Sequence, residues 1–426
     1  MNLCPVIDFR KMRRYLLLSL LLSCFFIGIQ AQPKQIVKTL ETHYWVGTWA
    51  TAQQIPVKSF MPYNNNLTNR SVRQVVKVSI GGNILRLRLS NELSTSPLVI
   101  RSVYVAYTTN AYSIYTKSAK YLRFNKSYKV TIPAGKAAWS DALPFELRPL
   151  SRLSITINYV QAPVAPTVHM GSRSTSYIMK GVTNAHSDFS KAFKEDHWFN
   201  ISGIDVWSDS SKCIAIIGNS ITDGKGSTDN ANNRWPDILS ETLQNKYKVQ
   251  NLGVLNLGIG NNRVALTGGF GYMAKVRFDR DILGQNGIES VVVFEGVNDI
   301  AAAKGDEKTV VRKLIEAYEE MIKKATANHL KVYLGTITPF LGSPVYSAAH
   351  EAAREETNEW IRSQKPKVGG ILDFDQLLRD PADIHRLKKN VQGGDWLHPN
   401  PEGYLQMGEY AAEIISGNTL TKVKSK

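Results

Sequence analysis

The sequence predicts an all-β domain followed by an α/β domain, because its hydrophobic pattern changes partway along the chain. From Tyr44 to about Tyr159, apolar and polar residues alternate with period two, which is typical of antiparallel strands with one buried face. After roughly Ser208, continuous apolar runs alternate with helical stretches. This second pattern is typical of a parallel sheet that helices cover on both faces.

In the first half, the clearest alternation places Leu85, Leu87 and Leu89 between arginines, and a second clear stretch runs from Leu153 to Tyr159. Turn clusters such as Gly81-Gly82-Asn83 separate the alternating segments. We therefore expect a β-sandwich or a jelly-roll-like domain. Further alternating stretches lie near residues 72–80, 99–107 and 128–132.

In the second half, five short apolar runs are the expected parallel strands. Apolar residues from Val310 to Ile322 recur at helical spacing on one face, and a final helix is expected from Pro401 to Ile415. The strands matter because ligand crevices in open α/β sheets form at the carboxyl ends of strands. The expected strands are Cys213 to Ile217, Lys248 to Leu255, Ser290 to Phe294, Lys331 to Thr336 and Ile371 to Phe374.

The first residues have the pattern of a secretory signal. Basic residues between Arg10 and Arg14 precede an apolar run from Leu16 to Ile29, and the small residue Ala31 follows. The run is shorter than the roughly 20 apolar residues of a membrane-spanning helix. We expect a secreted product, in the periplasm, outside the cell or on its surface, with no integral membrane segment after the signal is removed.

These patterns predict a signal peptide at residues 1–31, a β-sandwich-like domain at 32–207 and an α/β domain at 208–426. Lipidation of Cys24 stays open. Leu21-Leu22-Ser23-Cys24 resembles a lipoprotein cleavage box, but apolar residues follow the cysteine where a lipid-anchored protein normally turns polar.

Composition limits the possible partners. Loss of the signal removes four of 52 basic and one of 36 acidic residues, so the net charge falls from +16 to +13. The lysines are scattered rather than gathered into a stripe, so we expect no nucleic-acid partner. Cys213 is then the only cysteine, which excludes an intrachain disulfide and favours a small buried side chain. The sequence contains no H-E-x-x-H motif, and we expect no metal.

Ser220 lies in Gly218-Asn219-Ser220-Ile221-Thr222-Asp223-Gly224, directly after the first parallel strand. A serine at such a turn is exposed at the sheet edge. Glycines at both ends permit a tight backbone. Taken alone, a serine at a strand-turn-helix junction is more often a helix cap than a nucleophile.

Asp395 and His398 lie near the other end of the chain, in Asp395-Trp396-Leu397-His398-Pro399. A carboxylate three residues before an imidazole can reach its Nδ1, which leaves Nε2 to accept a serine proton. As a lone pair, the two residues could instead form a surface ion pair or bind a metal. Together with Ser220, they form a Ser-His-Asp set.

Two further motifs supply hydrogen-bond donors. Asn298 follows a buried strand in Glu295-Gly296-Val297-Asn298-Asp299, so its amide is expected beside the serine, although an Asx turn is an alternative. A glycine-rich loop from Asn256 to Arg263 offers backbone N–H groups. It lacks the G-x-G-x-x-G spacing of a dinucleotide site.

Together, these four segments resemble the four sequence blocks of the SGNH/GDSL hydrolase family, over nearly all of residues 212–415. The resemblance is closest to a two-domain secreted branch with an N-terminal β-domain. It implies a flavodoxin-like α/β/α core and no cofactor. Members of the branch carry stretches like Trp45 to Ala50, Arg234 to Asp237 and Phe278 to Asp281.

The resemblance also implies the role of each site residue. Ser220, Asp395 and His398 correspond to the catalytic triad, and Asn298 with the backbone N–H groups of Ser220 and Asn261 corresponds to the oxyanion hole. Two positions depart from the family pattern. Asn219 stands where the family usually has aspartate, and Asn261 stands where the family has glycine. An altered loop path would make Gly258 or Gly260 the donor instead.

We therefore expect a secreted serine esterase that acts on acetyl or other short acyl esters, with a small molecule or polysaccharide as substrate. The alternatives are an esterase or lipase for lipid-like acyl esters and a non-catalytic carbohydrate-binding surface protein. The sequence does not determine the oligomeric state.

Overall fold

The computed structural model describes residues 44–57, 60–62 and 66–424. These residues fall within one compact unit, His43–Lys426. Among the described helices, none is both long enough and apolar enough to cross a bilayer.

The change from antiparallel to parallel pairing falls where the hydrophobic pattern changes. The last antiparallel strand of the first half, β14 (Ile201–Ser208), is followed by the first parallel strand, β15 (Lys212–Gly218). The division into domains at 32–207 and 208–426 stays a prediction. The predicted signal peptide, residues 1–31, and Cys24 lie outside the described residues.

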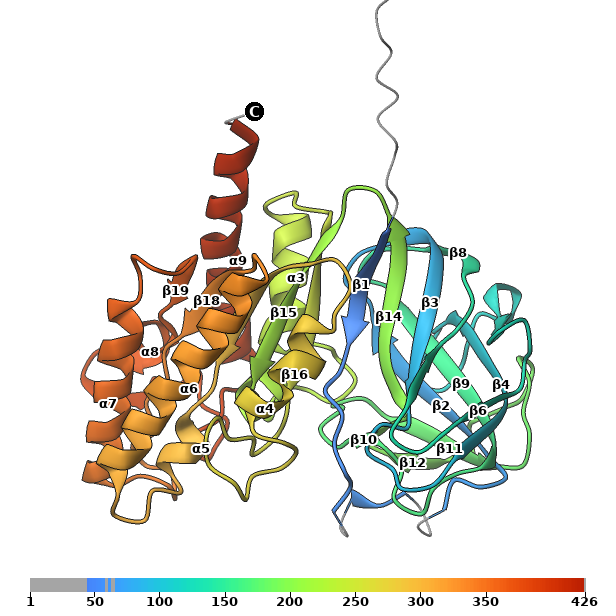
Figure 1. Cartoon of the computed structure of the whole chain (residues 1–426), viewed down its shortest axis with the longest axis horizontal. Coiled ribbons are helices and arrows are strands. Elements are labelled where there is room, and N and C mark those ends of the chain that lie inside the picture. The colour runs from blue at the N-terminus through green and yellow to red at the C-terminus, as the bar shows by residue number, and fades with distance from the viewer. Residues whose placement is uncertain (1–43, 58–59, 63–65, 425–426) are drawn as a thin grey trace, which may run out of the picture. The chain divides into compact units, whose positions relative to one another are not determined.

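Two antiparallel sheets make up the first half (Figure 1). Their apolar side chains share one core, which includes Leu85 and Leu87 from one sheet and Ile155 and Ile157 from the other. Two sheets that pack across one apolar layer form a β-sandwich, as the alternation predicts.

The first sheet contains, in spatial order, β1 (Tyr44–Ala50), β14, β3 (Gly82–Ser90) and β7 (Ala137–Trp139), with β8 (Leu143–Leu147) also paired to β3. The second contains β12 (Phe193–Glu195), β11 (Ser176–Lys180), β2 (Arg70–Lys77), β9 (Arg152–Gln161), β4 (Leu98–Tyr107) and β5 (Lys120–Leu122), with β6 (Val130–Ile132) also paired to β4. The shorter elements are a β10 (Val168–His169) and β13 (Trp198–Phe199) pair and the 3-10 helix η3 (Thr116–Ser118).

Strand β9 is buried on both faces, which the alternation does not predict. The pattern indicates a solvent-facing side at Ser154, Thr156 and Asn158, and this is wrong, because all three are buried. Their polar groups are paired inside the protein. Arg73 Nε donates to Thr156 Oγ1 at 3.1 Å, and the Thr183 N–H donates to Asn158 Oδ1 at 3.0 Å. Internal partners of this kind make a buried polar face stable.

Five parallel strands form the sheet of the second half, and their order matches a flavodoxin-like fold. Every neighbouring pair is parallel. In chain order the arrangement is 2-1-3-4-5, that of flavodoxin-like proteins. The strands in spatial order are β16 (Leu252–Gly258), β15, β17 (Ile288–Phe294), β18 (Lys331–Gly335) and β19 (Gly370–Leu372).

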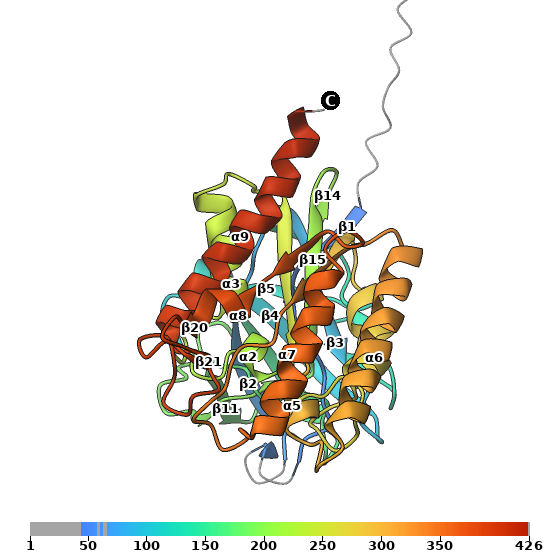
Figure 2. The same ribbon diagram turned by 90° about the vertical axis from the view of Figure 1, so that its left-hand side faces the viewer.

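Helices cover both faces of this parallel sheet (Figures 1 and 2). Successive residues of β15 point to opposite faces. Ile214 and Ile216 pack with residues of α3 (Trp235–Asn245) and α9 (Pro401–Lys424). On the other face, Ala215 and Ile217 share a core with α6 (Glu307–Ala327) and α7 (Ala348–Ser363). The shorter elements are α2 (Ser220–Asp223), α4 (Ala274–Phe278), η4 (Asp279–Leu283), α5 (Val297–Ile300), α8 (Phe374–Leu378), β20 (Arg379–Asp380) and β21 (Asp383–Leu387).

The predicted parallel strands are all present, but β16 is shifted along the sequence. The expected strand runs from Lys248 to Leu255, whereas the observed one extends from Leu252 to Gly258. Lys248 has φ 60°, a left-handed conformation that does not continue a strand. The glycine-rich loop therefore begins only after Gly258.

Strand β1 of the sandwich passes directly against β16 of the parallel sheet, and two glycines permit this approach. A Cβ atom at Gly253 would lie 2.4 Å from the carbonyl oxygen of Gly47, and one at Gly47 would lie 2.8 Å from Leu255 Cδ1. The Gly47 N–H donates to the Asn286 carbonyl at 2.9 Å. Sandwich and parallel sheet thus meet through backbone atoms at this point.

We predict that Gly253→Ala lowers the free energy of unfolding by about 1–3 kcal/mol, because the new methyl group forces the two strands apart. Urea unfolding of parent and variant measures the difference. Gly417→Ala is the control, since a Cβ at Gly417 in α9 meets nothing within 4 Å. Equal stability of Gly253→Ala and the parent would show that the strands tolerate separation.

Candidate active site

Helix α2 presents Ser220 at the carboxyl end of β15. Asn219 is the N-cap of this helix, and its Oδ1 accepts a hydrogen bond from the Ile221 N–H at 3.0 Å. Because Asn219 supplies the cap, the hydroxyl group of Ser220 is available for another partner. The helix ends after one turn at Gly224, which has φ 102°.

His398 is that partner, and Asp395 orients it. The distance between Ser220 Oγ and His398 Nε2 is 2.8 Å, and that between His398 Nδ1 and Asp395 Oδ2 is 2.7 Å. The other oxygen of Asp395 accepts the N–H groups of Leu397 at 3.0 Å and His398 at 2.9 Å. The carboxylate accepts the proton on Nδ1, so Nε2 has a lone pair facing the serine hydroxyl.

The environment of His398 favours its neutral form. Burial lowers the pKa of His398 below its ordinary value, and the nearby cations Lys225 and Arg173 act in the same direction. The Asp395 carboxylate opposes the shift without reversing it. Desolvation therefore outweighs the upward effect of the Asp395 carboxylate on the pKa of His398.

Asp395 remains ionised at neutral pH. Burial alone would raise its pKa, but the hydrogen bonds from His398 and Leu397 outweigh burial and hold the pKa below the ordinary value. The pair therefore combines a charged aspartate with a neutral imidazole. This is the protonation state in which Nε2 can remove a proton from Ser220.

The β16 loop, residues 259–266, contains the predicted donor Asn261. Strands β15 and β16 pair Gly218 with Gly258, so Ser220 and Asn261 follow neighbouring strand ends. Asn261 has φ 53°, in the left-handed region that asparagine tolerates. Within the part of the chain that the structure describes, the N–H groups of Ser220 and Asn261 have no hydrogen-bond acceptor.

The two substitute donors are engaged elsewhere. The Gly258 N–H donates to Asn256 Oδ1 at 3.0 Å, and the Gly260 N–H donates to Asp223 Oδ2 at 2.8 Å. Of the N–H groups of Gly258, Gly260 and Asn261, that of Asn261 is the one left for a ligand.

Asn298 lies in the first turn of α5, directly after β17. Its Nδ2 donates to the carbonyl oxygen of Asn262 at 2.8 Å, which connects it to the β16 loop. An amide group has two N–H bonds, so one remains for a ligand. Strands β15 and β17 are neighbours and pair Gly218 with Phe294, which places Ser220 and Asn298 after adjacent strand ends.

The buried guanidinium group of Arg277 binds to these strand ends. The Arg277 side chain is fully buried and donates to the carbonyl oxygens of Gly218 at 3.1 Å and Leu257 at 2.7 Å. It also donates to Asn262 Oδ1 and to Asp281 Oδ2, both at 3.0 Å. Because the guanidinium is a rigid planar fork, it fixes β15, β16 and the β16 loop relative to one another.

Two buried carboxyl groups support the same region. Asp299 accepts the N–H groups of residues 264–266 at 2.7, 2.9 and 2.9 Å, although burial raises its pKa. Glu295 lies 3.6 Å from Arg277 Nη2. Burial raises the pKa of Glu295 well above its ordinary value, which favours the neutral acid.

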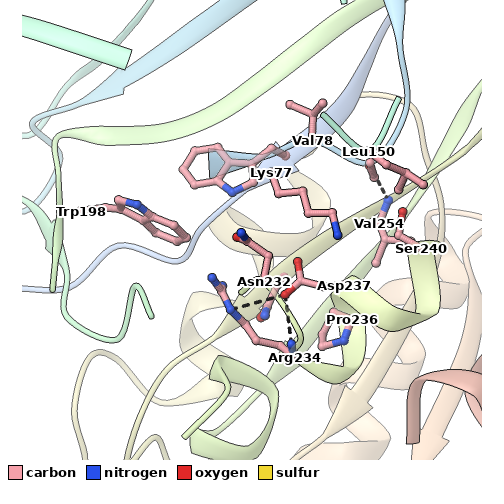
Figure 3. Close-up of a pocket in the computed structure, with 13 residues that line it drawn as sticks. Lys77, Val78, Leu150, Trp198, Asn232, Arg234, Pro236, Asp237, Ser240 and Val254 are labelled. Carbon is pink, nitrogen blue, oxygen red and sulfur yellow. Dashed lines mark hydrogen bonds and ion pairs between the residues drawn. The ribbon is translucent and has the colours of Figure 1, made fainter. Parts of the chain in front are cut away.

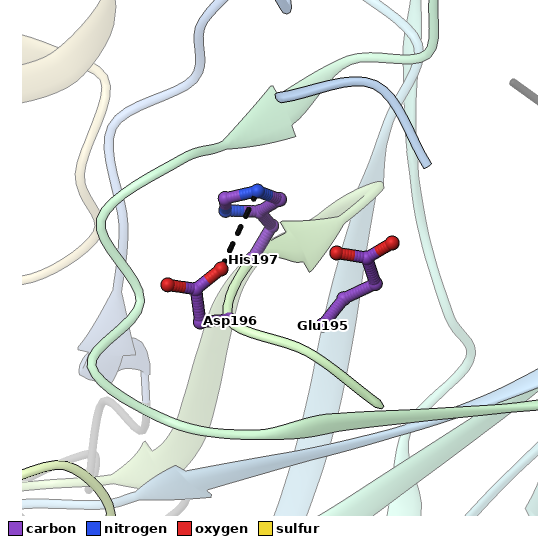
Figure 4. Close-up of side chains that lie close together, drawn as sticks. All are labelled: Glu195, Asp196 and His197. Atoms are coloured by element: carbon purple, nitrogen blue, oxygen red, sulfur yellow. Dashed lines mark ion pairs between the residues drawn. The ribbon is translucent and has the colours of Figure 1, made fainter. Parts of the chain in front are cut away.

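Among the residues that the structure describes, two clusters have the ligand atoms to hold a metal ion, and neither contains Ser220, His398 or Asp395. The first, shown in Figure 4, consists of Glu195, Asp196 and His197. The ring of His197 donates from Nδ1 to the Met170 carbonyl at 2.6 Å, so only Nε2 could bind a metal. The second cluster contains Glu351, Glu355 and His385.

A cavity of about 30 Å³ lies between the sandwich and α3 (Figure 3). Lys77 and Trp198 line it from the sandwich, and Arg234 and Asp237 line it from the second half. A cavity of this size holds a few water molecules at most. The cavity is too small for an ester substrate, and Ser220 does not line it.

Sequence reasoning missed three residues that organise the site. Arg277 directly precedes the stretch from Phe278 to Asp281, which resembles a stretch of the family branch. This position is the only feature of the sequence that points to Arg277. Asp223 follows Ser220 by three residues and contacts the β16 loop. His169 Nε2 lies 2.9 Å from Asp223 Oδ1, but His169 is remote from Asp223 in sequence, and nothing in its surroundings predicts this contact.

Comparison with known proteins identifies the second half of the chain. Residues 216–405 match the GDSL-like lipase/acylhydrolase family. The chain is 25% identical to a lipolytic protein of the G-D-S-L family from Desulfitobacterium hafniense, with 48% of this chain and 99% of that one covered and a TM-score of 0.37. It is 20% identical to a GDSL-like lipase from Bacteroides thetaiotaomicron, with 50% and 88% covered and a TM-score of 0.34.

A third structure is an acetyl xylan esterase from Geobacillus stearothermophilus, at 16% identity, 48% and 95% coverage and a TM-score of 0.38. No curated protein matches the chain. The family match spans Ser220, Asn298, Asp395 and His398. Residues 216–405 therefore form a GDSL-like lipase/acylhydrolase domain, and the chain is a carboxylic ester hydrolase.

Proposed function

We propose that Ser220 is the nucleophile of this esterase, with His398 as general base and Asp395 as the group that orients it. The observation that carries the proposal is the hydrogen-bonded series from Ser220 Oγ to His398 Nε2 at 2.8 Å and from His398 Nδ1 to Asp395 Oδ2 at 2.7 Å. A nucleophile, a base and an orienting carboxylate in this arrangement support acyl transfer to serine.

The reaction then proceeds through an acyl-enzyme. Ser220 Oγ attacks the ester carbonyl while its proton moves to His398 Nε2, and the carbonyl oxygen becomes an oxyanion. The Asn298 amide and the N–H groups of Ser220 and Asn261 stabilise this charge. Collapse breaks the ester C–O bond, and His398 protonates the departing alcohol. Water, deprotonated by His398, hydrolyses the acyl-serine by the same route.

We propose a short acyl ester on a carbohydrate as the substrate. No exposed large apolar side chain lies in the described segments 218–234 and 386–400, which carry Ser220 and His398. A site for long acyl chains would present an apolar surface. Lys225 and Arg173 place positive charge near His398 instead, and such charge suits a polar or acidic alcohol component.

Export of the protein is part of the proposal. It rests on the basic residues and the apolar run within residues 1–31. An extracellular or periplasmic location would give the enzyme access to acetylated polysaccharides.

The substrate class is tested by measuring the release of acetate from acetylated polysaccharides and the hydrolysis of esters of increasing acyl chain length. Preference for long acyl chains would favour the lipid-ester alternative.

We predict that Ser220→Ala reduces kcat toward p-nitrophenyl acetate by about 10⁴-fold or more, because the nucleophile is lost. The melting temperature should stay close to that of the parent, since only one hydroxyl group is removed. Turnover within tenfold of the parent in a folded variant would exclude Ser220 as nucleophile.

The pH dependence of kcat/KM provides a second prediction. Only neutral His398 can accept the serine proton, so kcat/KM should rise with pH as His398 loses its proton. Because burial lowers the pKa of His398, the midpoint of this acid limb should lie below 6.5, the ordinary value for histidine. Stopped-flow or initial-rate measurements across the acid range locate it.

Arg173→Met is the matched variant for the pH profile. Removing this cation favours the imidazolium form, so the midpoint should move upward in the variant. A midpoint above 6.5 in the parent enzyme would contradict the neutral, desolvated histidine.

A further inference from the structure

A segment of the sandwich, residues 169–174, lies against the helix that carries Ser220. A Cβ atom at Gly171 would lie 2.1 Å from Asp223 Oδ2, so a glycine is needed where this backbone crosses the carboxylate. Arg234 Nη2 donates to the Ser172 carbonyl at 2.8 Å, which is a second contact of this segment with the second half of the chain. The sandwich thus contacts the nucleophile helix directly.

Within this segment, His169 forms a buried pair with Asp223. His169 Nε2 lies 2.9 Å from Asp223 Oδ1, and both side chains are only 2% exposed. The other ring nitrogen, Nδ1, lies 2.9 Å from the Ala52 carbonyl oxygen, which can only accept. The ring also stacks on Trp198, with centroids 5.6 Å apart and an interplanar angle of 29°. Residues of the sandwich therefore fix both the position and the orientation of His169.

Asp223 in turn holds the β16 loop in position. While Oδ1 faces His169, Oδ2 accepts the Gly260 N–H at 2.8 Å. Gly260 immediately precedes Asn261, whose N–H is the proposed oxyanion donor. The position of that donor thus depends on a carboxylate that the sandwich holds in place.

We propose that His169 is a positioning residue for the oxyanion hole, acting through Asp223 and Gly260 on the N–H of Asn261. The inference rests on the proposed function, because it assumes that Asn261 faces the oxyanion. It also gives the sandwich a role in catalysis. Preorganised donors stabilise a transition state only when they are held in place, and a displacement of about 1 Å can cost about 10²-fold in rate.

The first test is His169→Phe, which removes both ring nitrogens but retains an aromatic ring against Trp198. We expect kcat for p-nitrophenyl acetate to fall about 10- to 100-fold, less than the roughly 10²–10³ for loss of a donor itself. KM should change little. The midpoint of the acid limb should not move, because the hydrogen bonds of His398 are untouched.

A transition-state analogue separates positioning from general destabilisation. A trifluoromethyl ketone with a short acyl chain adds to the serine and presents an oxyanion to the same donors. Its Ki should rise in His169→Phe by the same factor as kcat/KM falls. A purely structural role would lower the amount of folded enzyme and leave the Ki of the folded fraction unchanged.

A double-mutant cycle tests the route. If His169 acts through Asp223, then His169→Phe combined with Asp223→Ala should lose no more activity than Asp223→Ala alone. Additive losses would overturn the proposed route. His169→Gln retains one donor toward Asp223, so it should recover part of the activity lost in His169→Phe, including where the latter folds poorly.

Tyr104→Phe is the matched control. Tyr104 is another buried aromatic residue of the sandwich, on β4, and its hydroxyl group donates to the Asn184 carbonyl at 2.8 Å rather than to the 169–174 segment. The kcat of this control variant should stay within about twofold of the parent.

Unchanged kcat and Ki in His169→Phe, with Ser220→Ala inactive, would overturn this inference alone. An active Ser220→Ala would overturn the proposed function itself.

Discussion

The active-site region of this protein depends on one buried guanidinium. Arg277 donates to the last residue of β15, to the end of β16 and to the side chain of Asn262 in the β16 loop. A single side chain thereby binds two backbone carbonyl oxygens and one side-chain amide oxygen. Removal of Arg277 would leave Glu295 buried without this cation, whereas Asp281 would keep its ion pair with Arg280.

This constraint explains how a site can be assembled from remote parts of the chain. Parallel strands bring Ser220, Asn261 and Asn298 to one edge of the sheet, but strand pairing alone leaves the loops free to move. Arg277 holds the ends of β15 and β16 through their carbonyl oxygens, and Asp299 holds residues 264–266 through their N–H groups. The sandwich contributes the remaining contact, because its residue His169 holds Asp223, and Asp223 accepts the Gly260 N–H. On this account, catalysis requires both halves of the chain.

The sequence predicts most of the fold and part of the site, for physical reasons. Apolar runs of strand length locate all five parallel strands, and spacing pairs Asp395 with His398. The same reasoning fails for β9, because a period-two pattern cannot distinguish a solvent-facing side from a polar side covered by other chain segments. It also misses Arg277 and His169, because their partners are backbone carbonyls and a carboxylate that only the tertiary fold brings near.

The central claim is that Ser220 is the residue that becomes acylated. Reaction of the folded protein with a fluorophosphonate, followed by intact-mass and peptide mass spectrometry, tests this most directly. The account predicts one covalent adduct per chain, located on Ser220, with none in Ser220→Ala and much slower labelling in His398→Ala, because the base that activates the hydroxyl is missing. An adduct on a different residue, or undiminished labelling of Ser220→Ala, would contradict it.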